Sequence, residues 1–350
     1  MDTLTHALSG ALLARALVSR DTRAMTRRDA MALGFCAAAF PDADVVFSLA
    51  SPLAYLYHHR GITHSLLMLP LWALGIAWLW SRLKGNRAGF KPYLLVSAAA
   101  VAIHILGDVI TSFGTMVLAP LSDVRVQWDT TFIIDLWFSG IILAGLIASV
   151  LFRTSRVPAA ASLLVLCGYV SFQWLQQQQA IDVGEEYARE QGIAAASVSA
   201  LPRPVSPFNW MVVIAEPERY HYAFVNLRRE RARIAGPDAG FIERLDSAYL
   251  PVNSAHWQAA SRLGQGDERR LSEQAWQHAE FSFFRWFSAY PVFAAFERGN
   301  PAECVWFQDL RFLTPGRDRW PFRYGMCRST DGSWSAYQPG EGGERIRLRR

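Results

Sequence analysis

Acidic residues are scarce in the first half of this 350-residue chain, and none of them is a glutamate. Positions 1–175 hold nine aspartates and 13 Lys or Arg, and the first glutamate is Glu185. The whole chain is 51% hydrophobic with only four cysteines, which excludes intrinsic disorder and a disulfide-rich scaffold. So little charge beside long apolar runs is not typical of a soluble domain. Much of the net charge of +5 comes from short loops between these runs, so no nucleic-acid partner is expected.

Five stretches of the first half have the composition of membrane spans. Four contain no Asp, Glu, Lys or Arg, and the fifth is interrupted by Pro41, Asp42 and Asp44. A spanning helix needs roughly 17–25 apolar residues, which these lengths approach or reach. The alternative, a large buried helical core, is disfavoured by so many runs in one half. The stretches are 30–57, 65–81, 92–107, 136–152 and 157–181, and a shorter run, 3–14, either crosses or is half-inserted.

The short loops predict the orientation. Loops 19–30, 82–91 and 153–156 are rich in Lys and Arg, whereas 51–63 and 113–131 hold only Arg60 and Arg125. Because basic loops stay in the cytoplasm, the sequence predicts a multi-pass protein of the bacterial inner membrane. Loops 51–63 and 113–131, and everything after the last span, are then periplasmic.

The expected fold class is an α-helical polytopic membrane domain followed by a soluble α+β extracytoplasmic domain. We place the first domain at residues 1–178 and the second at 179–350. In the second, strand patterns occupy 208–227, 302–312 and 322–337, and a helix is predicted over 268–290.

Cys304 and Cys327 lie in the part of the chain expected to reach an oxidising compartment. They could form a disulfide there, since disulfides persist outside the cytoplasm. The sequence leaves open whether they pair.

Histidines and aspartates are concentrated where the chain is apolar. Ionisable side chains at membrane depth are costly and usually functional, and the predicted topology puts these groups on one side of the membrane. His104 and Asp108 are four residues apart, so both project from one face of a helix. His59 and His64 flank Gly61, which permits a sharp turn between two imidazoles.

Imidazole and carboxylate together are a ligand set for Zn²⁺, expected first, or Mn²⁺ as the alternative, with one to three ions bound. Such ions would polarise a phosphoryl or acyl oxygen and supply hydroxide. Taken singly, His104 and Asp108 could be a buried pair, and the PDAD segment a helix end followed by an N-cap. The candidate catalytic residues are Arg60, which could instead sit at the headgroup interface, and Asp44. The predicted ligands are His6, Asp42, Asp44, His59, His64, His104, Asp108 and Asp135.

Five motifs in fixed order resemble the YdjM-like family of inner-membrane proteins, described as predicted metal-dependent hydrolases. They are MDTLTHALSGAL, FPDADVVF, HHRGITHSLL, HILGDVITSFGT and WDTTFIIDLWF. The resemblance is close over 1–175; the second half is similar only to an extracytoplasmic extension of longer members. It implies a multi-helix membrane domain with a His/Asp metal site. By motif position it gives His64, His104 and Asp108 as first ligands, Asp42, Asp44 and His59 next, and His6 and Asp135 last.

The expected function is a membrane-bound metal-dependent hydrolase acting on a phosphoester or lipid-like substrate at the outer face of the inner membrane. Its expected partners are membrane lipids and a small-molecule or lipid substrate, and the oligomeric state stays open. One alternative is a non-catalytic metal-binding protein, either a transporter or a scaffold. A transporter would carry polar groups on both leaflets, which counts against it here. The other alternative is that the second half is an interaction module and the metal signal is spurious.

Overall fold

The structure is a computed structural model that describes residues 1–18, 25–85, 89–194, 197–299, 302–317, 320–340 and 342–348. The chain divides into two compact units, which are taken separately below. The first unit comprises Met1–Phe47 and His58–Leu175, and the second comprises Ser48–Tyr57 and Gln176–Arg350.

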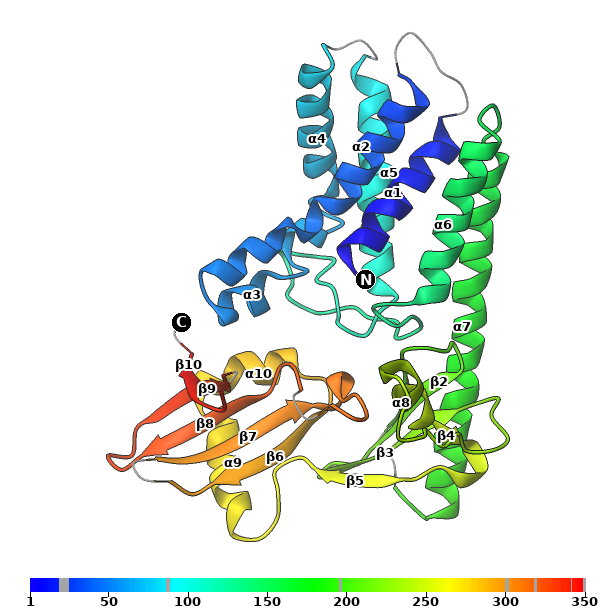
Figure 1. The fold of residues 1–350 in the computed structure, drawn as a ribbon. Coiled ribbons are helices and arrows are strands. Elements are labelled where there is room, and N and C mark those ends of the chain that lie inside the picture. Colours follow the sequence, from blue (N-terminus) through cyan, green and yellow to red (C-terminus); the bar gives the residue numbers. More distant parts are fainter. Residues whose placement is uncertain are drawn as a thin grey trace. The chain divides into compact units, whose positions relative to one another are not determined.

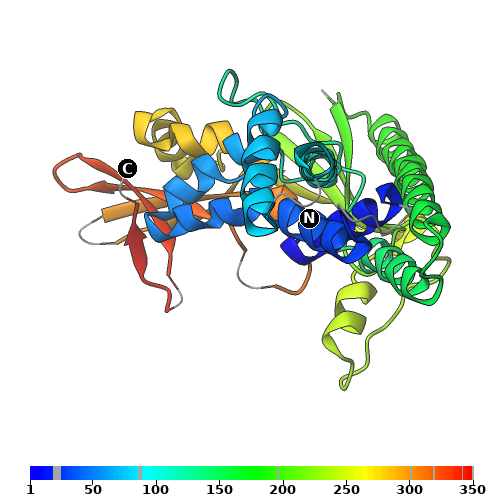
Figure 2. The ribbon, with the colours of Figure 1, turned by 90° about the horizontal axis from the view of Figure 1, so that it is seen from above.

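The first unit is helical (Figure 1). Helices α6 and α7 lie side by side in both views of the ribbon (Figures 1 and 2), and the Ser162 hydroxyl of α7 donates to the Ile141 carbonyl of α6 at 2.7 Å. The chain runs through α1 (Thr3–Leu17), α2 (Arg27–Ala39), the 3-10 helix η1 (Pro41–Leu49), α3 (Pro52–His58), η2 (Ile62–His64), α4 (Leu69–Leu83), α5 (Phe90–Val109), α6 (Leu136–Leu151) and α7 (Val157–Glu190). Helix α3 falls almost wholly within the second unit, and α7 continues into it after Leu175.

Each predicted span is largely helical, but not all of these helices are long enough to cross alone. Helices α5 and α7 are long and apolar enough to cross a membrane. Up to four spans result if two bent pairs each count as one: α2 with η1, bent by 42°, and 52–64 with α4, bent by 78°. Helix α6 is apolar but shorter, with 16 residues.

Two glycines let α1 and α2 pack with their backbones in near contact. A Cβ added at Gly34 would lie 2.4 Å from the Gly10 carbonyl oxygen, and one at Gly10 would lie 2.2 Å from the Gly34 oxygen. Neither position therefore accommodates a side chain, since real Cβ atoms do not approach backbone so closely. This approach sets the position of His6, carried by α1, relative to the end of α2, where Asp42 follows.

The basic turns of the first unit meet at one end of the helices. Arg15 donates to the Arg153 carbonyl at 3.2 Å, and Lys84 pairs with Asp29 at 2.7 Å. These contacts bring the α1–α2, α4–α5 and α6–α7 connections together. Parts of the basic loops, residues 19–24 and 86–88, lie outside the described residues.

The second unit contains two five-stranded sheets. The first sheet has the order β1-β2-β3-β4 with β5 also paired to β3, and every pairing except that of β3 with β4 is antiparallel. The second is an antiparallel meander of order β10-β9-β8-β7-β6. The strands are β1 (Ser197–Pro202), β2 (Asn209–Ala215), β3 (Arg219–Asn226), β4 (Leu250–Pro251), β5 (Gln258–Ser261), β6 (Pro291–Glu297), β7 (Ala302–Asp309), β8 (Tyr324–Ser329), β9 (Trp334–Pro339) and β10 (Arg345–Arg347).

The strands predicted in 208–227, 302–312 and 322–337 are confirmed as β2 with β3, β7, and β8 with β9. The continuous helix predicted over 268–290 is wrong. His278 adopts an extended conformation (φ −63°, ψ 141°), and its ring accepts a hydrogen bond from Glu280 N at 3.3 Å, so one helix ends and another begins. The helices of this unit are α8 (Phe241–Ser247), α9 (Asp267–Gln277) and α10 (Ser282–Phe287), with short η3 (Val252–Ser254), η4 (Ala279–Phe281) and η5 (Leu310–Phe312).

Cys304 and Cys327 lie opposite each other on β7 and β8 and form a disulfide. Both are buried, beside Trp306. The structure thus answers the question that the sequence left open, whether these two cysteines pair.

Candidate metal centre

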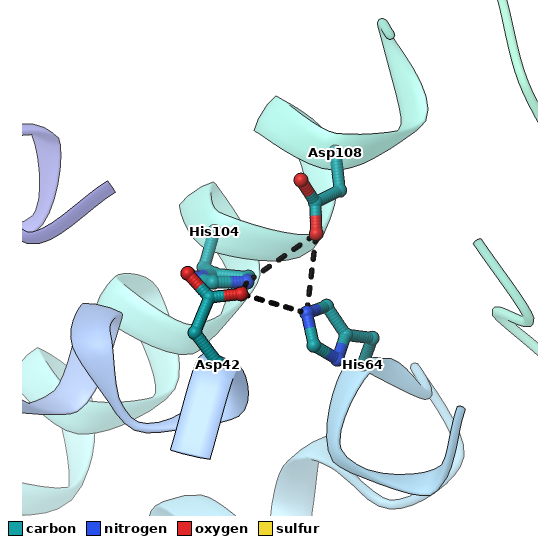
Figure 3. Close-up of side chains that lie close together, drawn as sticks. All are labelled: Asp42, His64, His104 and Asp108. Atoms are coloured by element: carbon teal, nitrogen blue, oxygen red, sulfur yellow. Dashed lines mark ion pairs between the residues drawn. The ribbon is translucent and has the colours of Figure 1, made fainter. Parts of the chain in front are cut away.

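Four side chains from three separate segments converge at one point in the first unit (Figure 3). Asp42 comes from the first turn of η1, His64 from the end of η2, and His104 and Asp108 from the last turns of α5. Each offers one ligand atom, and these four atoms all lie within 4.8 Å of one another. His64, His104 and Asp108 are fully buried, whereas the Asp42 side chain is 11% exposed.

Four separations among these atoms are close to the ligand spacing around a small ion. Asp108 Oδ2 lies 3.1 Å from His64 Nε2 and 3.4 Å from His104 Nε2. Asp42 Oδ1 lies 3.5 Å and 3.6 Å from the same two nitrogens. Four ligands bound tetrahedrally to Zn²⁺ at about 2.0–2.1 Å are about 3.3–3.4 Å apart. The carboxylate–imidazole separations therefore suit a single ion held between these atoms.

The outer nitrogens of both imidazoles are already engaged. His104 Nδ1 lies 2.6 Å from the carbonyl oxygen of Ala38, so this nitrogen carries the proton and donates it. His64 Nδ1 lies 2.9 Å from Thr63 Oγ1, which in turn donates to Asp44 Oδ2 at 3.1 Å. Because a neutral imidazole has one donor and one acceptor nitrogen, Nε2 of each neutral ring presents a lone pair to the centre.

The centre therefore gathers hydrogen-bond acceptor atoms with no donated proton between them. His64 Nε2, His104 Nε2 and Asp108 Oδ2 are buried and make no hydrogen bond. Lone pairs facing carboxylate oxygens at these separations repel one another unless a cation lies between them. The donor set fits a divalent transition metal, because imidazole and carboxylate are its ordinary protein ligands.

Asp44 lies behind His64 rather than in the group of four. Its Oδ1 accepts from His59 Nδ1 at 2.8 Å, and its Oδ2 accepts from Arg60 N at 3.0 Å and lies 3.4 Å from His64 Nδ1. This carboxylate orients the 59–64 segment and one of its imidazoles. It corresponds to the outer carboxylate that fixes the tautomer of many metal-binding histidines.

Arg60 and His6 hold the second oxygen of Asp108. Arg60 Nη2 lies 2.9 Å and His6 Nε2 3.0 Å from Asp108 Oδ1, and the Met1 amino group also contacts this oxygen. Arg60 is buried and donates to Thr111 Oγ1 at 2.8 Å as well. These contacts direct Asp108 Oδ2 alone toward the centre. They place the Arg60 guanidinium behind Asp108, against its second oxygen.

The sequence predicted that Gly61 would take the unusual backbone conformation of the sharp turn, but Arg60 takes it instead. Arg60 itself adopts the left-handed conformation (φ 59°), which is strained for a residue with a side chain and recurs at functional sites. Gly61 has φ −97°, and a Cβ on it would lie 2.8 Å from the His58 carbonyl oxygen. Glycine is thus required for close approach, while Asp44 stabilises the strained neighbour.

The structure brings seven of the eight predicted ligands together as four inner and three outer residues. The outer three are His6, Asp44 and His59. Asp135 is elsewhere: it caps α6 by accepting from Phe138 N at 2.9 Å, and also accepts from Tyr169 and Gln173 at 3.0 and 2.9 Å.

Two contributors had no sequence signal or only a weak one. The Ala38 carbonyl, which fixes the His104 tautomer, belongs to the backbone and leaves no trace in residue identity. Thr63 lies inside the HHRGITH motif, where its position beside His64 was the only available clue.

Comparison with known proteins adds one decisive match. The family model described as YdjM inner membrane protein matches residues 1–180. The chain belongs to the YdjM inner membrane protein family. The matched region contains all four residues of the centre, so the centre lies in the part of the chain that defines the family.

A curated relative is similar over a shorter region. It is the uncharacterized protein YfhP of Bacillus subtilis (strain 168), 27% identical over 140 residues, which is 39% of this chain and 42% of the relative. The match thus spans less than half the length of that relative. No solved structure matches this chain.

Proposed function

We propose that this YdjM family member is a membrane-bound metal-dependent hydrolase. The observation that carries the proposal is the convergence of two imidazole Nε2 atoms and two carboxylate oxygens within 4.8 Å, with the other imidazole nitrogens already bonded. His64, His104, Asp108 and Asp42 would hold the ion. A bound Zn²⁺ or Mn²⁺ lowers the pKa of water toward neutrality and polarises the oxygen of a phosphoester or ester.

The chain's own residues divide the remaining work. Arg60 and His6 fix Asp108 in a one-oxygen orientation, and Asp44 fixes His64. Asp42 is the only one of the four with an exposed edge, so substrate and water would reach the centre from its side. A carboxylate there would accept a proton from an attacking water, which is the role of a general base.

The proposed location is the bacterial inner membrane, with the second unit in the periplasm. Family membership and the apolar helices support the membrane assignment. The Cys304–Cys327 disulfide supports a periplasmic second unit, because disulfides persist in oxidising compartments. The joined basic turns support a cytoplasmic location for their own end of the first unit.

One observation favours a second candidate, a protein that binds an ion without turnover. Four protein ligands in a tetrahedron are typical of structural zinc sites, whereas catalytic sites keep a position open for water. Hydrolysis would require either a fifth coordination position for water or the release of Asp42 from the ion.

The test begins with the metal content of the full chain purified in detergent, measured by mass spectrometry for wild type and Asp108→Asn. Hydrolysis of phosphodiester and phospholipid panels is then measured with and without chelator, using Asp135→Asn as the matched control. We expect an ion and a chelator-sensitive activity in wild type and Asp135→Asn, and neither in Asp108→Asn. A bound ion without activity on any panel member would leave the non-catalytic candidate, and no ion would remove both.

A further inference from the structure

The loop that joins α5 to α6 has polar side chains inside and apolar side chains outside. Thr111, Thr115, Thr130 and Thr131 are each no more than 2% exposed. Six large apolar side chains, 38–83% exposed, cover its outer side, which we call the loop face: Leu118, Leu121, Val124, Trp128, Ile133 and Ile134. A loop in water normally shows the reverse pattern, and exposed apolar patches of this kind mark contact with a membrane or another molecule.

The backbone of this loop is largely satisfied from within. Thr115 and Val126 exchange two hydrogen bonds of 2.9 Å, and Trp128 N donates to the Val109 carbonyl at 2.8 Å. Thr130 N donates to the Ile110 carbonyl at 3.0 Å. Irregular backbone enters a lipid phase only where its polar groups find protein partners, and these bonds supply such partners for part of the loop.

The charge of Arg125 is turned inward, whereas Asp123, between Leu121 and Val124, is exposed. Arg125 donates to the Gly114 carbonyl at 3.1 Å and to the His59 carbonyl at 3.4 Å, and its guanidinium lies over the Phe113 ring. On either side of the loop in the chain, the adjoining helices also expose apolar side chains, Leu106 on α5 and Trp137 on α6. Tryptophan at such a boundary is typical of the membrane–water interface.

The inner side of the same loop packs on residues that lie behind the candidate metal centre. Met116 N donates to the Arg60 carbonyl at 2.9 Å, and Arg125 contacts His59 as described above. The loop therefore adjoins the residues behind Asp108 and His64.

From these observations we propose that the loop face is immersed in the interface of the lipid bilayer, and that the substrate of the metal centre is a membrane lipid. The bilayer is the occupant because the loop face is flanked along the chain by exposed apolar side chains of α5 and α6, and α5 is long and apolar enough to cross a membrane. The lipid then reaches the centre from within the membrane, on the side where Asp42 is exposed. The substrate part of this proposal rests on the proposed function, and the immersion of the loop does not.

Immersion is tested on the full chain with Cys36 and Cys167 replaced by Ala and the disulfide retained. A fluorescent probe is attached in turn to Leu121→Cys, Leu164→Cys on α7 and Ile234→Cys in the second unit. These three native side chains are 83%, 74% and 90% exposed, which makes them matched sites. Vesicles contain phosphatidylethanolamine and phosphatidylglycerol with a nitroxide-labelled phospholipid as the quencher.

We expect the probe at position 121 to be quenched by the nitroxide lipid as the probe at position 164 is, while the probe at position 234 is quenched only by iodide in the water. Quenching at position 121 by iodide alone would overturn the proposal. Protection from both quenchers would also overturn it, because the loop face would then be covered by protein, either the second unit or another copy.

The substrate class is tested with Leu121→Asp and with Ile234→Asp as its control. Each variant is assayed on a phospholipid in vesicles and on a water-soluble phosphodiester, and its metal content is measured. We expect the ratio of lipid to soluble activity to fall about tenfold in Leu121→Asp, equivalent to about 1.4 kcal/mol, with metal content unchanged. An unchanged ratio overturns the lipid substrate. If wild type binds no ion and hydrolyses neither substrate, the proposed function fails, while the quenching result still decides immersion.

Discussion

The charge on Asp44 is the most informative one to remove, because Asp44 is not one of the four candidate ligands and acts on the metal position only through other residues. Its carboxylate accepts from His59, Thr63 and the Arg60 backbone, and faces the outer nitrogen of His64. In Asp44→Asn the side chain keeps its size but loses its charge and one acceptor. We expect the full chain to fold and to bind its metal ion more weakly.

The size of the effect follows from the contacts. Hydrogen bonds to a charged group contribute about 1.5–3 kcal/mol each, and part of this stabilises His64 in its ligand orientation. Losing an outer carboxylate typically weakens metal affinity about 10–100-fold. We expect Asp44→Asn to fall in that range, which corresponds to about 1.4–2.8 kcal/mol of binding free energy.

The assay is competition with a chromogenic chelator, using protein purified in detergent and stripped of metal. Asp135→Asn is the matched control, since Asp135 is also a buried aspartate with several donors, but it caps α6. Its metal affinity should stay within about twofold of wild type, as for sites that share no partner. Wild-type affinity in Asp44→Asn, or an equal loss in both variants, would refute the reasoning.

Three further predictions follow from the fold and the centre. Asp42→Asn should weaken metal binding, since it changes one of the four ligands, and should lower the kcat of the metal-loaded protein about 100-fold or more, as expected on loss of a general base; unchanged kcat at saturating metal would contradict that role. Gly34→Ala should destabilise the first unit by about 1–3 kcal/mol through overpacking. Gly75→Ala, with open space around its Cβ position, should instead stabilise the first unit by up to about 1 kcal/mol. Thermal unfolding of the two variants in detergent compares these effects. Replacing Cys304 and Cys327 by Ser should cost about 3 kcal/mol for a bridge spanning 23 residues, measured by denaturant unfolding.

Much of the candidate centre was predictable because burying ionisable side chains in an apolar environment costs free energy. His64, His104 and Asp108 stand out since ionisable groups within apolar runs need a reason to be there. The i,i+4 spacing on α5 then fixes two of the four ligands on one face by helix geometry alone. Asp42 follows from its interruption of an otherwise apolar stretch.

The sequence could not separate inner from outer residues. Asp42 and Asp44 are two positions apart in the same segment, yet one faces the centre and the other faces away from it, behind His64. The residue type of Arg60 suits binding of a substrate phosphate, but its guanidinium is buried against Asp108. Asp135 has the residue type of a ligand and caps a helix instead.

Apolar run lengths, the basic turns and the β patterns of the second half thus determined the helical first region, its expected orientation and most of the strands. These features are local, because hydrophobic period and charge act over a few residues. Which carboxylate meets which imidazole was decided only by the tertiary structure. The contacts depend on the Gly10–Gly34 approach, on the bonds of Arg60 to Asp44 and Asp108, and on one backbone carbonyl at Ala38. Each of these joins segments that are distant in the chain.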